Sequence, residues 1–291
     1  MPRFQRHEAW RHTQIVSLFK IVLRKPALPG GVLLILEVGD KEPFYSRPIV
    51  GAPKPTGPVN MHLLDGQQRL TALWRTLKDD YDDLQFMVSI GPTEAEEDVD
   101  DFGTAPDLPR IDKIKRWDRK GVMQPVWADD AVQCFDRDFV PIRCLLPGKP
   151  GKKWLQDWLD AAKDGGFDPS SKMACIYELR QRIARYVVPF LSLGAETSRE
   201  TALDVFIKMN TSASPLKDFD IVTAQLEEAS GQSLHEFVVS LLEAQTAAKD
   251  FGKIKDILLS VVALLSGKPP LKKTYLEKDF LEKIWAKTGT E

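Results

Sequence analysis

Cysteine and histidine are scarce in this chain, and their scarcity argues against two classes of structural site. The three cysteines, Cys134, Cys144 and Cys175, are scattered over 291 residues and form no C-x-x-C pair. We therefore expect neither a disulfide framework nor a zinc site, and a reducing, cytoplasmic location. The four histidines form no H-E-x-x-H motif, so a zinc-dependent hydrolase is not expected either.

Long apolar runs and an excess of positive charge are also missing. The longest apolar stretches, 32–36 and 257–265, are far shorter than the roughly 18 residues that cross a membrane. The N-terminal sequence MPRFQRHEAW lacks the apolar core of a signal peptide. The formal net charge is -2, so DNA remains a possible partner only through a local cluster of cations. We expect no contact with a membrane.

The hydrophobic periodicity changes along the chain. Residues 9–24 show the spacing of an amphipathic helix that Pro26 ends, and short runs of strand-forming residues follow at 32–38, 59–64 and 84–90. Residues 102–150 look irregular, with short strand candidates near 122–127 and 139–146. GKPGKK at 148–153 indicates a surface turn, with phosphate contact as the alternative. From residue 154 the pattern is mainly helical, including a helix expected at 199–210, with one strand at 187–193.

These patterns predict an α+β fold, with a small mixed sheet followed by a mainly helical half. We expect one domain at 1–150 and a second part at 151–291. Within the second part, residues 187–215 are expected to return to the N-terminal site.

The most informative segment is VNMHLLDGQQRLTALWRTL at 59–77, where a strand leads directly into a helix. Asp65 is expected to be the N-cap, and Gln68 completes a capping box. The first turn of a helix has unpaired N–H groups and attracts anions. Gly66 would let a phosphate approach, and Arg69 adds a fork of donors. The alternative is a capped helix that binds no ligand.

Three blocks of this sequence, in order, resemble one family. LLDGQQRLTAL at 63–73 carries the signature D-G-Q-Q-R-[LI]-T, PRFQRHEAW at 2–10 is similar to the opening P-x-F-Q-R-x-x-x-W, and FIKMNTSASPLKDFDI at 206–221 is similar to a later F-x-x-x-N-T block. The family is the N-terminal domain of GmrSD-type restriction endonucleases. The resemblance implies a fold of ParB and sulfiredoxin type.

The resemblance also implies binding and hydrolysis of a nucleoside triphosphate with Mg²⁺, which regulates a nuclease that attacks modified, often phage-derived, DNA. No H-N-H pattern is visible, so a partner nuclease domain or chain is expected. Ser212 and Ala213 depart from the family's glycine. The alternative is therefore a non-catalytic module that binds nucleotide or DNA phosphate and docks a partner nuclease.

The site residues carried over from the family fall into three groups. Asp65 and Gln68 are assigned to catalysis, and Asp65 also to the metal. The nucleotide is assigned to Gln5, Arg6, Gly66, Gln67, Arg69, Asn210 and Thr211. The phosphate interpretation would fail if Arg69 were locked inward against acidic neighbours, with no open cavity before the helix amides.

Overall fold

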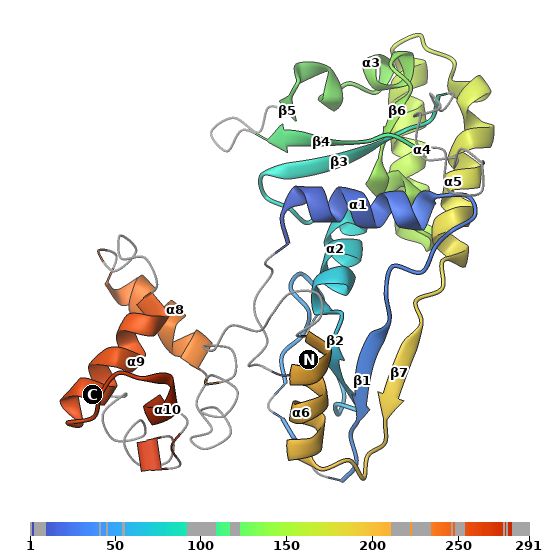
Figure 1. Ribbon diagram of the computed structural model, residues 1–291. Coiled ribbons are helices and arrows are strands. Elements are labelled where there is room, and N and C mark those ends of the chain that lie inside the picture. The colour runs from blue at the N-terminus through green and yellow to red at the C-terminus, as the bar shows by residue number, and fades with distance from the viewer. Residues whose placement is uncertain are drawn as a thin grey trace, which may run out of the picture.

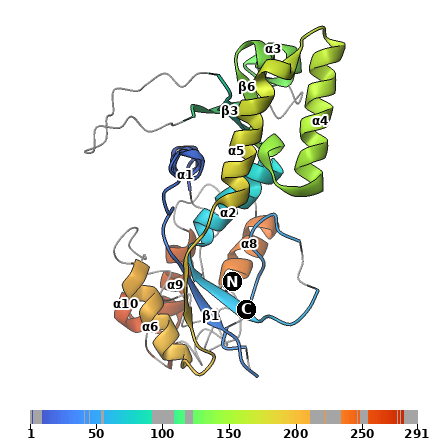
Figure 2. The ribbon, with the colours of Figure 1, turned by 90° about the vertical axis from the view of Figure 1, so that its right-hand side faces the viewer.

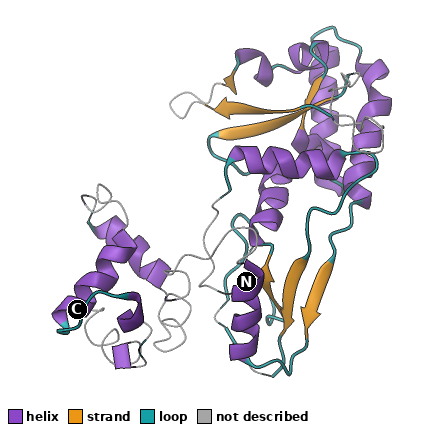
Figure 3. Ribbon diagram, viewed as in Figure 1, coloured by secondary structure: helices purple, strands orange, loops and turns teal. Residues whose placement is uncertain are grey.

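The structure is a computed structural model that describes residues 2, 10–40, 42–44, 46–53, 56–91, 109–116, 123–210, 222, 234–245, 247, 254–275, 277 and 279–280. Its fold is α+β, as predicted: one small sheet is mixed, a second is antiparallel, and helices pack on both (Figures 1 and 3). Within the described ranges, no helix is long and apolar enough to cross a membrane.

The mixed sheet joins strands that are far apart in the sequence. Its central strand is β1 (Leu33–Glu37), which pairs antiparallel with β2 (Met61–Asp65) and parallel with β7 (Phe190–Leu193). In this register Asp65, the last residue of β2, lies opposite Leu34, near the start of β1. The turn after β2 is therefore placed beside the loop that leads into β1.

One face of the mixed sheet is covered by α6 (Arg199–Asn210). Leu34 and Leu36 lie on either side of the half-buried Ile35, and Leu64 lies between two half-buried residues of β2, so these three side chains share that face. They form a buried cluster with Phe44 and with the apolar side of α6, which contributes Ala202, Leu203 and Phe206. Figure 1 shows α6 alongside β2 and β1.

The antiparallel sheet has the order β5 (Met123–Gln124), β4 (Ile111–Arg116), β3 (Leu84–Ser89), β6 (Phe139–Pro141). Along the chain, α3 (Ala131–Asp136) lies between β5 and β6. Short 3-10 helices run over 126–129 and 142–145. β3 is buried along most of its length because it is covered on both faces.

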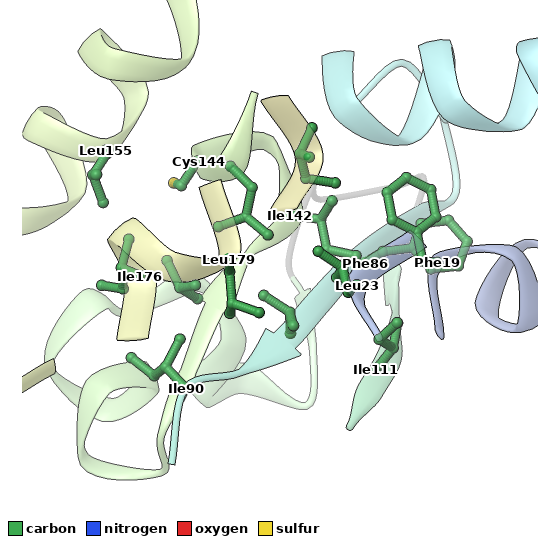
Figure 4. Close-up of a cluster of buried hydrophobic side chains, with 14 of the residues drawn as sticks. Phe19, Leu23, Phe86, Ile90, Ile111, Ile142, Cys144, Leu155, Ile176 and Leu179 are labelled. Carbon is green, nitrogen blue, oxygen red and sulfur yellow. The ribbon is translucent and has the colours of Figure 1, made fainter. Parts of the chain in front are cut away.

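The main core lies against this second sheet. It receives side chains from α1 (His12–Leu23), α2 (Gln67–Lys78), α4 (Gly148–Asp164) and α5 (Met173–Arg185) (Figures 2 and 4). The most deeply buried members include Ile15, Phe19, Leu23, Phe135, Ile142 and Leu145. The core contains residues from both sides of position 150, such as Ile142 and Leu155, and α4 runs through that position without a break.

A separate apolar cluster lies near the C-terminus. It is formed by α8 (Leu234–Ala244), α9 (Ile254–Leu265) and α10 (Lys272–Tyr275), together with single described residues on either side. Its fully buried members include Leu234, Ala263 and Phe280.

Two local predictions were wrong. Residues 111–116, in the region predicted to be irregular, form the full strand β4. GKPGKK is not a surface turn: it forms the first turns of α4, where a Cβ on Gly151 would lie 2.0 Å from the carbonyl oxygen of Leu146. Pro150 is tolerated there because the first turn of a helix needs no N–H from it.

Candidate functional site

The predicted strand–turn–helix exists, but its cap is not the expected residue. Asp65 ends β2, and Gly66 is the N-cap of α2, with a φ of 94° and no side-chain cap hydrogen bond. The N-cap prediction for Asp65 was therefore wrong. A side chain at residue 66 would be strained at this φ, and its Cβ would lie 2.2 Å from Cδ2 of Leu33. A glycine is needed because the chain turns sharply against β1.

The capping box is also absent. Oε1 of Gln68 accepts a hydrogen bond from the backbone N–H of Trp10 at 3.3 Å. This contact ties the first turn of α2 to the residues just before α1. Gln67 is buried, with 6% of its surface exposed.

Arg69 is held by three oxygen atoms. Its Nη2 donates to Oδ2 of Asp65 at 2.9 Å and to the carbonyl oxygen of Val32 at 2.9 Å, and its Nη1 donates to the carbonyl oxygen of Gly30 at 3.3 Å. The side chain of Arg69 is 18% exposed and that of Asp65 29%. In this conformation the positive charge of Arg69 is paired with Asp65. Arg69 is therefore turned toward an acidic neighbour, which is one of the two observations that would argue against phosphate binding.

Two glycines make room for the Arg69 guanidinium. Gly31 has a φ of 99°, and a Cβ there would lie 1.9 Å from Nη1 of Arg69. A Cβ on Gly66 would lie 3.1 Å from Nη2. The loop is held from its other side by Tyr186, whose Oη accepts the N–H of Gly30 at 2.8 Å. The sequence signalled only a turn at this glycine pair, not its contact with Arg69.

A buried histidine lies on the same strand as Asp65. His62 is 0% exposed, its Nδ1 is 3.1 Å from Oγ of Ser46, and its Nε2 is 3.7 Å from Oε1 of Glu42. Burial lowers the pKa of His62 to about 4, although the nearby Glu42 carboxylate acts in the opposite direction. His62 is therefore neutral near pH 7. No motif in the sequence indicated a buried histidine at this position.

The remaining predicted residues come from the N-terminal block and from the end of α6. Gln5, Arg6 and Thr211 lie outside the described residues, and Asn210 is the last residue of α6. As for metal ligands, the described ranges contain no group of three or more His, Cys, Asp or Glu side chains that could hold an ion. Any Mg²⁺ at the turn would therefore depend on Asp65 and on oxygen atoms of a ligand.

Comparison with known proteins gives one clear result. A search of the curated proteins finds no match to this chain. In contrast, the family model described as "GmrSD restriction endonuclease, N-terminal domain" matches residues 1–227. This range includes both sheets, α6 and the turn between β2 and α2. The chain therefore belongs to the family of GmrSD restriction endonuclease N-terminal domains.

Proposed function

We propose that the turn between β2 and α2 binds a nucleoside triphosphate with Mg²⁺, and that the domain hydrolyses it in the cytoplasm to regulate a nuclease that attacks modified phage DNA. The observation that carries the proposal is the position of Asp65 and Arg69, on either side of Gly66, at the first turn of α2. Membership of a restriction endonuclease family supports the proposal, because a restriction endonuclease has a nuclease activity that this domain could regulate.

The backbone of the turn is suited to an anion. The first intrahelical hydrogen bond runs from the N–H of Leu70 to the carbonyl of Gly66 at 3.0 Å. The N–H groups of the first turn lie before the start of the helix's own hydrogen-bond ladder and carry the positive end of its dipole. Leu33 and the Arg69 guanidinium already fill the space where a Cβ of Gly66 would lie, so a phosphate would have to reach these N–H groups from another side of the turn.

The side chains of the turn would have to exchange partners for binding. Arg69 would turn one guanidinium N–H from Asp65 to a phosphate oxygen, and Asp65 would then hold Mg²⁺. Mg²⁺ commonly takes one or two carboxylates together with phosphate oxygens, which fits a site with a single acid. When bound, the ion neutralises phosphate charge. Gln68 would orient the attacking water, and Gln67, Gln5, Arg6, Asn210 and Thr211 would complete the site.

A second candidate is a module that binds nucleotide or DNA phosphate without turnover and docks a partner nuclease. Ser212 and Ala213, which replace the family's glycine, favour it. The paired state of Arg69 favours it as well, since a salt bridge must be broken before the phosphate is held.

The test compares two arginines of the same helix. Arg75, like Arg69, donates from its guanidinium to a backbone carbonyl, that of Asp80 at 2.9 Å, and lies 3.4 Å from the Asp80 carboxylate. We expect Arg69→Lys to weaken binding of ATP, GTP, CTP or UTP with Mg²⁺ by about tenfold, because a charged hydrogen bond is lost. Arg75→Lys should leave the affinity unchanged. Isothermal titration with and without Mg²⁺ measures both.

Phosphate release by the wild-type chain then separates the two candidates. Release that depends on Arg69 supports hydrolysis, and binding without release supports the non-catalytic module. Failure of all four triphosphates to bind at millimolar concentration would remove the nucleotide from both. Equal losses in the two lysine variants would show that the effect comes from α2 as a whole and not from Arg69.

A further inference from the structure

One edge of the antiparallel sheet is open beside a groove. β5 pairs only with Lys115 and Arg116 of β4, so among the described residues no strand covers the β4 edge at 111–114. A groove of about 420 Å³ lies there, between the first turn of α1 and the segment that holds Pro125 and Trp127. Figure 1 shows α1 running alongside β3 and β4, with the short β5 at the end of the sheet.

The charge at this edge is locally positive although the chain as a whole is not. Residues 110–116, RIDKIKR, hold four cations and one carboxylate, whereas the whole chain has a net charge of -2. Arg110 binds Asp112 through two hydrogen bonds, of 3.2 and 2.8 Å, and so neutralises that carboxylate. Lys113 and Lys115 are exposed and form no ion pair with a carboxylate of the described ranges.

Lys113 has an unusual neighbour. Its Nζ lies 2.8 Å from Nε2 of His12, the first residue of α1. At this distance Nε2 of His12 can accept a hydrogen bond from the Lys113 ammonium. An anion placed between them would let both groups donate. The first turn of α1 lines the same groove through His12 and Thr13 and adds the positive end of its dipole.

We propose that this β4 edge site, made of His12, Thr13, Lys113 and Lys115, binds the phosphate backbone of DNA. Lysines beside helix N–H groups are typical phosphate contacts in such complexes, and the apolar surface of Pro125 and Trp127 can receive a sugar or a base. The membership of a restriction endonuclease family makes DNA the expected source of the phosphates. The β4 edge site does not require the nucleotide proposed at Arg69.

The experiment is a salt titration of DNA binding. Anisotropy of a fluorescein-labelled duplex, followed through a KCl series, gives the slope of log affinity against log salt. Each phosphate contact contributes about 0.9 to that slope, so Lys113→Ala should lower it by about 1 and weaken binding roughly tenfold at low salt. The pair Lys113→Ala with Lys115→Ala should lower it by about 2. Lys163→Ala, at an exposed lysine in the last turn of α4, is the matched control.

Several results would overturn the proposal. One is a wild-type chain that does not bind the duplex at low salt, and another is the same slope in the Lys113 and Lys163 variants. A third is displacement of the DNA by a nucleoside triphosphate whose competing affinity falls in Lys113→Ala. That result would make free phosphate, and not DNA, the ligand of this site. A fourth is unchanged DNA binding with new self-association in sedimentation, which would show that the lysines only protect the strand edge. Nucleotide titration of the same variants should be normal, so the outcome is separate from that at Arg69.

Discussion

Replacing Gly31 by alanine tests whether the loop before β1 is built around the Arg69 guanidinium. The φ of 99° at residue 31 costs an alanine about 1–2 kcal/mol. Its Cβ would also lie 1.9 Å from Nη1 of Arg69, so the guanidinium must move away and lose its hydrogen bond to Gly30. That loss adds about 2 kcal/mol, since hydrogen bonds from charged groups contribute about 1.5–3 kcal/mol. We expect Gly31→Ala to lower the free energy of unfolding by about 3–4 kcal/mol.

Gly166 offers a matched control for the backbone cost. It has a φ of 85°, and a Cβ there would meet no atom within 4 Å. Gly166→Ala should therefore lose only the left-handed cost of about 1–2 kcal/mol. Urea unfolding followed by tryptophan fluorescence measures both variants, and their difference isolates the displacement of Arg69.

A double-mutant cycle completes the argument. In an Arg69→Ala background the guanidinium is gone, so Gly31→Ala should cost no more than Gly166→Ala. If Gly31→Ala is as mild as Gly166→Ala in the wild-type background, the guanidinium does not lie against residue 31. If the excess cost persists without Arg69, some other contact causes it. Either result refutes the reasoning.

Two further predictions concern buried ionisable side chains. The pKa of His62 is about 4 in the folded chain and 6.5 when the side chain is exposed. The unfolded state therefore binds the proton more tightly. The free energy of unfolding should fall by about 3 kcal/mol as the pH drops from 6.5 to 4. Urea unfolding against pH should show this slope in the wild type and a weaker one in His62→Gln; parallel curves would contradict it. Arg143 lies 2.8 Å from Oδ2 of Asp79, whose side chain is 10% exposed, so Arg143→Ala should destabilise by about 3 kcal/mol because a mostly buried carboxylate loses its cation. Adding Asp79→Asn should restore part of that loss, and no recovery would mean that the pair is not the cause.

Much of the fold could be predicted where one face of an element is buried and the other is not. α6 was predicted at 199–210, with the bounds that the structure shows, because its apolar residues recur at helical spacing. β4 was missed because it is covered on both faces near its start: Ile111 joins the main core and Ile114 joins a second cluster with Met87. Two buried residues on opposite faces, with Asp112 and Lys113 between them, remove the period of two that marks a half-exposed strand.

The site could be predicted only as far as its local sequence determines it. The strand, the turn and the helix follow from residues 59–77 alone. The partners of Arg69 do not, because the carbonyls of Gly30 and Val32 reach it through the register of β1 against β2, more than thirty residues away in sequence. The wrong N-cap has a similar origin. Asp65 is a good cap by residue type, but the pairing of β2 as far as Asp65 leaves the cap position to Gly66.

The contacts of Arg69 connect stability and binding at one point. The guanidinium holds the loop before β1 and the carboxylate of Asp65 at the same time. A phosphate that takes the Asp65 position on Nη2 can leave the two carbonyl bonds in place, so the loop need not open. Asp65 alone would then lose its cation, and a divalent ion is the partner that would satisfy it. For this reason Mg²⁺ and a polyphosphate should bind more tightly together than either does alone, since each removes the unpaired charge that the other creates.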